Sequence, residues 1–177
     1  MTEIIIIGDS NDTALERLIK HKLSETYSIL YIKGNEITGT GIGYELTVID
    51  SAAPIIAGLT EPIVVAKKNA VLPEDLPPDC TAVISSHDPS QLRAASRSGV
   101  YVVDCGLSPT STVSFSSESD DTLVISLNRS LKALSGREIQ PLEMPVKKLG
   151  TDDYTLMSFT ALRLLLDDFD SELGKLI

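Results

Sequence analysis

The sequence predicts an α/β fold of Rossmann-like type, with three layers built around a mainly parallel sheet. Short β-branched runs without polar alternation, such as residues 4–7 (IIII), are typical of parallel strands that are covered on both faces. Amphipathic segments and glycine or proline turns follow several of these runs, which is the alternation that builds a doubly covered sheet. With 177 residues, of which 42% are hydrophobic and 23% charged, the chain is expected to form one domain over residues 1–177.

Strands alternate with helices over the first hundred residues. The first helix is expected at 12–23, with Asp12 as its N-cap and with apolar residues on one stripe. The second is expected from Asp88-Pro89 to Arg97, because a capping residue followed by proline is a helix start. Strands are expected at 4–7, 28–33, 44–49, 62–67, 81–85 and 100–104.

Two further features of these hundred residues are not expected to be binding sites. Gly39, Gly41 and Gly43 precede a strand rather than opening a helix, so they predict a loop and not a dinucleotide site. Lys67 and Lys68 are expected to be a solvated pair at a strand end.

The C-terminal part has a different pattern. Segments 112–116, 122–127 and 137–146 follow one another without a helix, which predicts a small antiparallel section at about 110–147. Residues 153–169 form a helix whose apolar residues surround its axis, so it is expected to be buried on more than one side. The same apolar surface makes a homodimer the alternative use of this helix.

Composition excludes several classes of function. A net charge of -10 repels phosphate backbones and anionic bilayers, so neither nucleic acid nor a membrane is expected as a partner. The N-terminal apolar run is too short for a signal peptide or a membrane span, which predicts a cytoplasmic protein. Cys80 and Cys105 lie far apart without metal-ligand spacing and are expected to be buried, reduced thiols.

The first strand is followed by a glycine turn and then by a helix, an arrangement found at the N-terminal end of several kinds of active site. Gly8-Asp9-Ser10 resembles the first block of the GDS(L) or SGNH hydrolases, in which the serine is the nucleophile. In that family the histidine base lies near the C-terminus, whereas the last histidine here is His87. The esterase interpretation is therefore disfavoured.

A phosphate-binding loop is the other interpretation of this stretch. Such a loop needs glycines for close approach of backbone amides, a lysine against the phosphate charge and a hydroxyl for magnesium. Thr13 stands where the hydroxyl belongs, but Asp12 stands where the lysine belongs. The sequence thus predicts a vestigial phosphate loop, made of Gly8, Asp9, Ser10, Asn11, Asp12 and Thr13.

Two further segments resemble the central domain of the Mur ligases, which join amino acids to peptidoglycan precursors and are related to folylpolyglutamate synthetases. They are residues 81–89 (TAVISSHDP), followed by a helix, and residues 99–107 (GVYVVDCGL). The antiparallel section and the turn 149–154 (LGTDDY) before a leucine-rich helix follow in the family's order. The resemblance implies a P-loop NTPase-like fold of Mur-ligase type over nearly the whole chain.

Departures from the family pattern argue against its activity. Asn11 and Asp12 replace a loop glycine and the loop lysine, and the family's Gly-x-His-Asn turn reads Gly150-Thr151-Asp152-Asp153. The family's long insertion with its magnesium-binding histidine and modified lysine has no counterpart between Val65 and Pro78. The expectation is a pseudoenzyme: a non-catalytic, Mur-ligase-like protein without cofactor that binds a small molecule or a protein partner.

Two alternatives stay open at this point. Asp9, Asp50, His87 and Asp88 each follow an expected strand, and such residues meet at one edge of a parallel sheet. Asp9, Asp50 and Asp88 could hold magnesium, which would make the protein a metal-dependent enzyme. The second alternative is a structural subunit that pairs with a true ligase.

Overall fold

The computed structural model describes residues 1–53, 58–148 and 150–168. By the contacts within it, the chain divides into two compact units, Met1–Val102 and Val103–Ile177. Leu149 of the predicted turn and Phe169, the predicted end of the last helix, lie outside the described residues. The single domain expected from the sequence stays a prediction.

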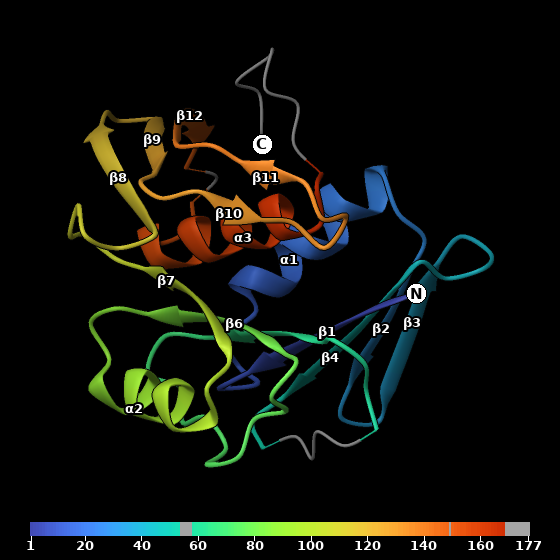
Figure 1. Cartoon of the computed structure of the whole chain (residues 1–177). Helices are drawn as coiled ribbons and strands as arrows, with labels where there is room; N and C mark the ends of the chain where they lie inside the picture. Colours follow the sequence, from blue (N-terminus) through green and yellow to red (C-terminus); the bar gives the residue numbers. More distant parts are fainter. Residues whose placement is uncertain (54–57, 149, 169–177) are drawn as a thin grey trace. The chain divides into compact units, whose positions relative to one another are not determined.

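The first unit is built on a mainly parallel sheet (Figure 1). Its strand order is β6-β5-β1-β4-β2-β3. The central strand β1 pairs in parallel with β4 and with β5, and Ile4, Ile6 and Ile7 have no exposed surface. The predicted doubly covered strand is therefore confirmed. The strands are β1 (Thr2–Ile7), β2 (Ile29–Lys33), β3 (Glu36–Thr40), β4 (Leu46–Ser51), β5 (Ile63–Ala66) and β6 (Thr81–Ser85).

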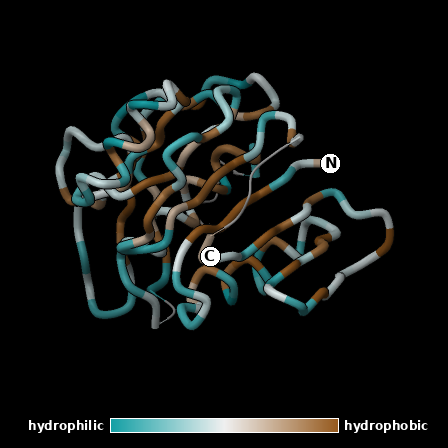
Figure 2. The backbone as a smooth tube through the Cα atoms, turned by 90° about the horizontal axis from the view of Figure 1, so that it is seen from below, coloured by the Kyte–Doolittle hydropathy of each residue, from teal (hydrophilic) through white to brown (hydrophobic). Residues whose placement is uncertain are grey.

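Two helices of the first unit lie on opposite faces of this sheet, α1 (Ala14–Lys22) on one side and α2 (Pro89–Ser98) on the other (Figure 1). A short 3-10 turn, η1 (Leu23–Glu25), continues α1. The core on the α2 side includes Ile5, Ile7 and Ala95. Figure 2 colours the backbone by hydropathy, and many of the outer turns of the tube are hydrophilic.

The two helices of this unit begin in different ways. Asp88 caps α2 as predicted, since its carboxylate accepts hydrogen bonds from the backbone N–H groups of Ser90 and Gln91. The predicted N-cap of α1 is wrong by one residue: Thr13 holds that position without a side-chain bond. The Asp12 carboxylate still accepts the Ala14 N–H at 3.1 Å and so satisfies one donor of the first turn.

The glycine-rich segment is the largest departure from the expected elements. Residues 36–40, predicted as loop, form β3, which pairs antiparallel with β2 from Lys33↔Glu36 to Ile29↔Thr40. All five residues of β3 are exposed, so the strand lacks the buried alternation that identifies a strand in a sequence. The Tyr44 hydroxyl packs over Gly39, so a Cβ at this position would lie 2.3 Å from it and would displace the partly exposed tyrosine ring.

The second unit contains the predicted antiparallel section. β8 (Val113–Glu118), β9 (Thr122–Leu127) and β12 (Leu142–Lys147) form a meander, and β7 (Tyr101–Cys105) pairs in parallel with β8 at Cys105↔Val113. The predicted segment 137–146 is two strands, because β11 (Glu138–Ile139) pairs instead with β10 (Leu131–Lys132).

The helix α3 (Asp153–Leu165) packs against β8, β9 and β10 within the second unit. Asp152 caps it by accepting the Thr155 N–H at 3.1 Å. Ten of its residues are buried, which confirms the predicted burial on more than one side. Cys80 and Cys105 are free and buried, also as predicted. Within the described residues, no helix combines the length and the apolarity needed to cross a bilayer.

Candidate functional site

The loop 8–13 joins β1 to α1, and the carboxyl ends of two neighbouring strands lie beside it. β1 pairs in parallel with β4 and β5, with Ile6 opposite Asp50 and Ile7 opposite Ala66. The register therefore brings Asp50 and the next residue after β5, Lys67, to the same edge of the sheet as the loop. This edge is where parallel α/β sheets bind ligands.

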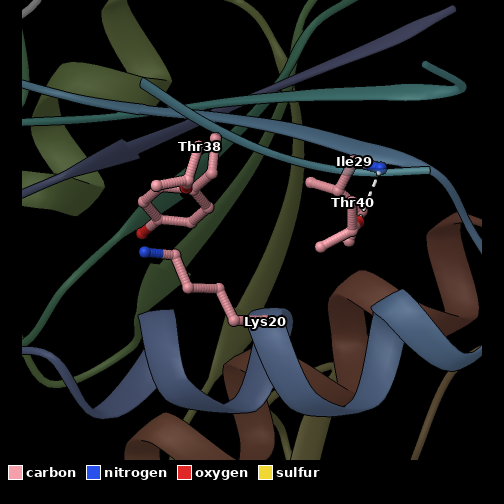
Figure 3. Close-up of a pocket in the computed structure, with 5 residues that line it drawn as sticks. Lys20, Ile29, Thr38 and Thr40 are labelled. Atoms are coloured by element: carbon pink, nitrogen blue, oxygen red, sulfur yellow. Dashed lines mark hydrogen bonds between the residues drawn. The ribbon is translucent and has the colours of Figure 1, made fainter. Parts of the chain in front are cut away.

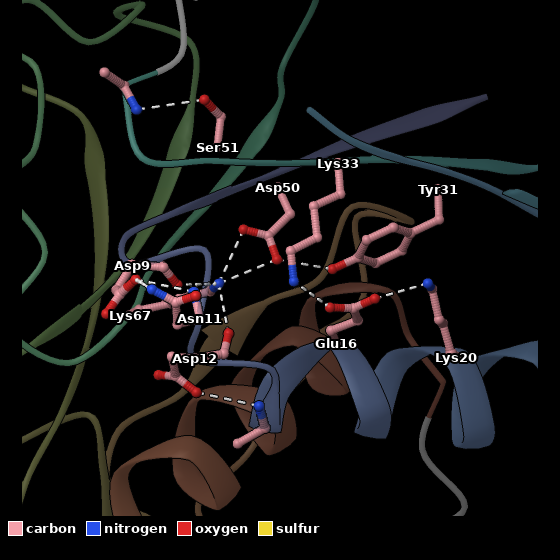
Figure 4. Close-up of polar contacts among 12 residues, drawn as sticks. Asp9, Asn11, Asp12, Glu16, Lys20, Tyr31, Lys33, Asp50, Ser51 and Lys67 are labelled. Carbon is pink, nitrogen blue, oxygen red and sulfur yellow. Dashed lines mark hydrogen bonds and ion pairs between the residues drawn. The ribbon is translucent and has the colours of Figure 1, made fainter. Parts of the chain in front are cut away.

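The ammonium group of Lys67 occupies the inside of the loop (Figure 4). Its Nζ donates to the backbone carbonyl oxygens of Asp9 at 2.9 Å and Asp12 at 2.7 Å. It also lies 2.9 Å and 3.1 Å from the two carboxylate oxygens of Asp50. The side chains of Lys67 and Asp50 are 2% and 0% exposed, so this ion pair is sealed from solvent.

The loop therefore presents oxygen atoms to a cation. A working phosphate loop does the reverse, since its backbone N–H groups surround an anion. Several amides of this loop already have acceptors in the protein: Gly8 donates to Ser51 O, Asn11 to the Asp9 carboxylate and Asp12 to Asp9 O. The residues of the predicted vestigial loop are thus brought together, but around Lys67.

Gly8 allows the lysine to cross the end of β1. A Cβ on Gly8 would lie 2.6 Å from the Lys67 Cβ, a distance that side chains do not adopt, and the Gly8 φ is +147°. The glycine that the sequence suggests for phosphate approach here makes room for the protein's own side chain.

Tyr31 completes the buried cluster. Its hydroxyl donates to Asp50 Oδ2 at 3.0 Å, so the Asp50 carboxylate is held by Lys67 and by Tyr31. Burial raises the pKa of the Tyr31 hydroxyl far above its usual range, and the negative charges of Asp50 and Glu16 raise it further. A buried carboxylate needs such partners, because an unpaired charge in the interior is strongly unfavourable.

A second charged cluster, half-open to solvent, lies next to Tyr31. The Glu16 carboxylate binds Lys20 at 2.7 Å and Lys33 at 2.6 Å, one oxygen to each ammonium (Figure 4). Partial burial acts to raise the pKa of Glu16, but the hydrogen bonds from Lys20 and Lys33 outweigh it, and the net pKa is lowered. Lys20 also lies 4.5 Å from the centroid of the Tyr31 ring, a cation–π contact.

The acids predicted as metal ligands have other roles in this structure. The Asp9 carboxylate accepts the backbone and side-chain N–H groups of Asn11, and Asp50 is paired with Lys67. Asp88 caps α2, and its pKa is lowered chiefly by the hydrogen bond from the Ser90 hydroxyl. His87 is exposed on the turn before α2. Among the described residues, no three His, Cys, Asp or Glu side chains are grouped as a metal site.

Lys67 and Tyr31 are the residues that sequence reasoning missed. The predicted solvated pair is wrong for Lys67, which is 3% exposed, whereas Lys68 is exposed. The sequence does contain a signal for the ion pair. Asp50 and Lys67 stand at the ends of two expected apolar strands, and opposite charges at neighbouring strand ends can pair at one edge of the sheet. Tyr31 carries no such signal, since its partner depends on strand register.

Comparison with solved structures shows which fold this is. The MurF ligase from Thermotoga maritima, in complex with ADP, matches 94% of this chain with a TM-score of 0.54 and 14% identity. A UDP-N-acetylmuramoyl-L-alanyl-D-glutamate–2,6-diaminopimelate ligase matches 96% of it with a TM-score of 0.57 and 11% identity. The fold is that of the Mur ligases.

The chain spans less than half of each of these two proteins, 45% of the first and 44% of the second. No family model matches the sequence, and no curated protein matches it. At these identities the similarity concerns the fold, and the differences at the loop have to be interpreted from the chain's own residues.

Proposed function

We propose that this chain is a non-catalytic protein with a Mur-ligase-like fold, which has lost ATP-dependent ligation and acts by binding a small molecule or a protein partner. One observation carries the proposal: the Lys67 ammonium group is hydrogen-bonded to two carbonyl oxygens inside the loop where a nucleotide phosphate would be expected. A cytoplasmic location belongs to the same proposal.

Electrostatics at the loop oppose a triphosphate. Lys67 is neutralised by Asp50, so its charge is not available to an external anion. Asp12, at the place of the family's lysine, and the exposed Asp9 add negative charge. At about 4 Å and an intermediate dielectric, a like-charge pair costs on the order of 4 kcal/mol, and about 1 kcal/mol where water screens it, as at the exposed Asp9. Replacing attraction by repulsion is therefore enough to abolish ATP binding at cellular concentrations.

Calorimetric titration of the full chain with ATP, with and without magnesium, tests this proposal. We expect no saturable heat, and no release of phosphate in a parallel hydrolysis assay. Saturable ATP binding at micromolar concentration together with hydrolysis would overturn the loss of activity.

A variant series tests the loop itself. Asn11→Gly with Asp12→Lys restores the family residues, but we expect no ATP affinity from this pair alone while Lys67 occupies the loop. Adding Lys67→Met and Asp50→Asn removes the internal cation together with its partner, and ATP affinity is then expected to appear. Circular dichroism of each variant checks that it is folded. If the double variant binds ATP as well as the quadruple variant does, Lys67 is not the obstacle.

The nature of the ligand or partner is tested separately. A thermal-shift screen with nucleotides, UDP-sugars, magnesium and manganese detects a ligand, which at 100 times its dissociation constant adds about 2.7 kcal/mol of stability. Heat on titration with magnesium or manganese alone would favour the metal-dependent enzyme instead. Co-purification of a Mur ligase with the chain from its native cell would favour the structural subunit.

A further inference from the structure

A pocket lined by no residue of the loop 8–13 lies between α1 and the β2–β3 hairpin of the first unit. It has a volume of about 200 Å³ and is lined by Lys20, Ile29, Tyr31, Thr38 and Thr40 (Figure 3). The register places Tyr31 opposite Thr38 and Ile29 opposite Thr40, so these four residues form one face of the hairpin. Lys20 extends from α1 toward that face (Figure 3). For comparison, an apolar cavity of about 150 Å³ holds one benzene molecule.

The lining combines an apolar surface with a few polar groups. Ile29 and Tyr31, each 2% exposed, form the floor of the pocket. The methylene groups of Lys20 and the methyl groups of the two exposed threonines form its apolar walls. The Thr40 hydroxyl accepts the Ile29 N–H at 3.2 Å, which fixes that side chain. Within the described residues the Thr38 hydroxyl has no hydrogen-bond partner, so it is available to a ligand. Apolar walls with a few convergent polar groups are typical of small-molecule sites.

The positive charge of Lys20 at the pocket favours a negatively charged ligand. An ammonium group has three N–H donors, and within the described residues Lys20 uses one of them, on Glu16. Glu16 divides its two oxygens between Lys20 and Lys33, so it does not neutralise Lys20 completely. Since the Lys20 side chain is 33% exposed, an incoming anion can reach it. A second negative charge on the ligand would be repelled by Glu16, which favours a monoanion.

We infer that this pocket binds a small monocarboxylic acid with an apolar body about the size of a benzene ring. The carboxylate accepts a hydrogen bond from the Lys20 ammonium and one from a threonine hydroxyl. The apolar body lies between the Lys20 methylene groups and the threonine methyl groups, above the floor formed by Ile29 and Tyr31. This site is separate from the blocked loop, so it gives the small-ligand part of the proposed function a location and a ligand class.

Benzoate is the probe that tests the inference, with benzamide and benzylamine as its neutral and cationic counterparts. In proton–nitrogen NMR spectra of the full chain, benzoate is expected to shift the amide signals of Thr38 and Thr40, with a dissociation constant on the order of 1 mM. Benzamide should bind about five-fold more weakly, because it lacks the charge-assisted contact, and benzylamine more weakly still. The ATP titration described above is independent of this result, so the two proposals can fail separately.

Matched variants assign the binding to the pocket. Lys20→Met keeps the apolar stem and removes the charge, so benzoate should then bind no better than benzamide. Lys22→Met removes a charge from the same helix outside the pocket and should leave binding unchanged. Thr38→Phe on the exposed β3 fills the pocket and should abolish the shifts.

Three results would overturn the inference. They are the absence of shifts at the hairpin at about 20 mM benzoate, equal binding of benzoate and benzamide, and an equal loss in the Lys20→Met and Lys22→Met variants. Tighter binding of inorganic phosphate than of benzoate would overturn the carboxylate class.

Discussion

Two lysine–carboxylate clusters meet at Tyr31, and they differ in how much water reaches them. In the closed cluster, Lys67 and Asp50 are 2% and 0% exposed, and the Lys67 ammonium donates to two backbone carbonyls and to the Asp50 carboxylate. In the open cluster, Lys20 and Glu16 are 33% and 14% exposed and line or adjoin a pocket. The Tyr31 hydroxyl belongs to the first cluster and its ring to the second.

Lysine–carboxylate pairs of different exposure are suited to different roles, one to stability and the other to ligand contact. A sealed ion pair has to be fully satisfied by hydrogen bonds within the protein, which is the arrangement of the closed cluster and fits a structural role. A partly exposed pair contributes less to stability than a buried one and keeps donors available, which suits the open cluster to the proposed recognition. Under the proposals above, this chain binds its ligand at the open cluster and not at the loop. The variants below test this contrast, in order of decreasing effect.

Lys67→Met should cause the largest loss of stability, about 3–5 kcal/mol, because it leaves the Asp50 carboxylate buried without its counter-ion. Urea denaturation at neutral pH measures this change. Lys68→Met is the matched control at the next, exposed position and should change stability by less than about 0.5 kcal/mol. Equal effects of the two substitutions would show that the closed cluster is not structural.

Gly8→Ala should cost about 3 kcal/mol, since the new Cβ meets the Lys67 side chain at a backbone conformation that favours glycine. Gly34→Ala is a control for a positive φ without crowding. Gly34 also has a positive φ, +58°, but in the described structure its Cβ would meet nothing within 4 Å. That control should cost only about 1 kcal/mol. A Gly8→Ala loss no larger than the control would contradict the close packing of Lys67 against the loop.

Tyr31→Phe should cost about 1.5–2 kcal/mol, because a hydrogen bond to a charged, buried acceptor is lost. It should also change the alkaline limb of the stability curve. The pKa of Tyr31 is raised in the folded state, so above about pH 10 the unfolded chain loses this proton first and stability falls. The extra slope, about 1.4 kcal/mol per pH unit, should be present in the unmodified protein and absent from the variant. Parallel alkaline limbs in the two proteins would contradict the burial of this hydroxyl.

Glu16→Gln should have the smallest effect, about 1 kcal/mol at pH 7, since its ion pairs are partly open to water. The pKa of Glu16 is lowered in the fold, so its contribution is present above the usual glutamate pKa and lost as pH falls through the lowered value. The gap between variant and unmodified protein should therefore narrow steadily as the pH falls below about 4.3, the usual glutamate pKa. Chemical denaturation over a series of acidic pH values measures it, and a gap that does not narrow with falling pH would contradict the ionic origin.

The sequence by itself determined those parts of the protein whose cause is local. The run at residues 4–7 determined a buried central strand because four β-branched side chains in succession need cover on both faces. Asp88-Pro89 determined the start of α2 because a cap and a fixed proline φ act within one turn. The strand β3 could not be predicted in this way, since neither of its faces is buried and it has no pattern to detect.

Only the tertiary structure decided what the loop 8–13 surrounds. Lys67 is 58 residues from Asp9 and 17 from Asp50 along the chain, so no local pattern relates them. They meet because the registers of β1 with β4 and β5 align three strand ends. The energy of a buried charge then depends on which opposite charge and which oxygen atoms are placed within about 3 Å of it. The sequence shows that Asp50 and Lys67 carry opposite charges, but only the strand registers show that the two side chains form an ion pair.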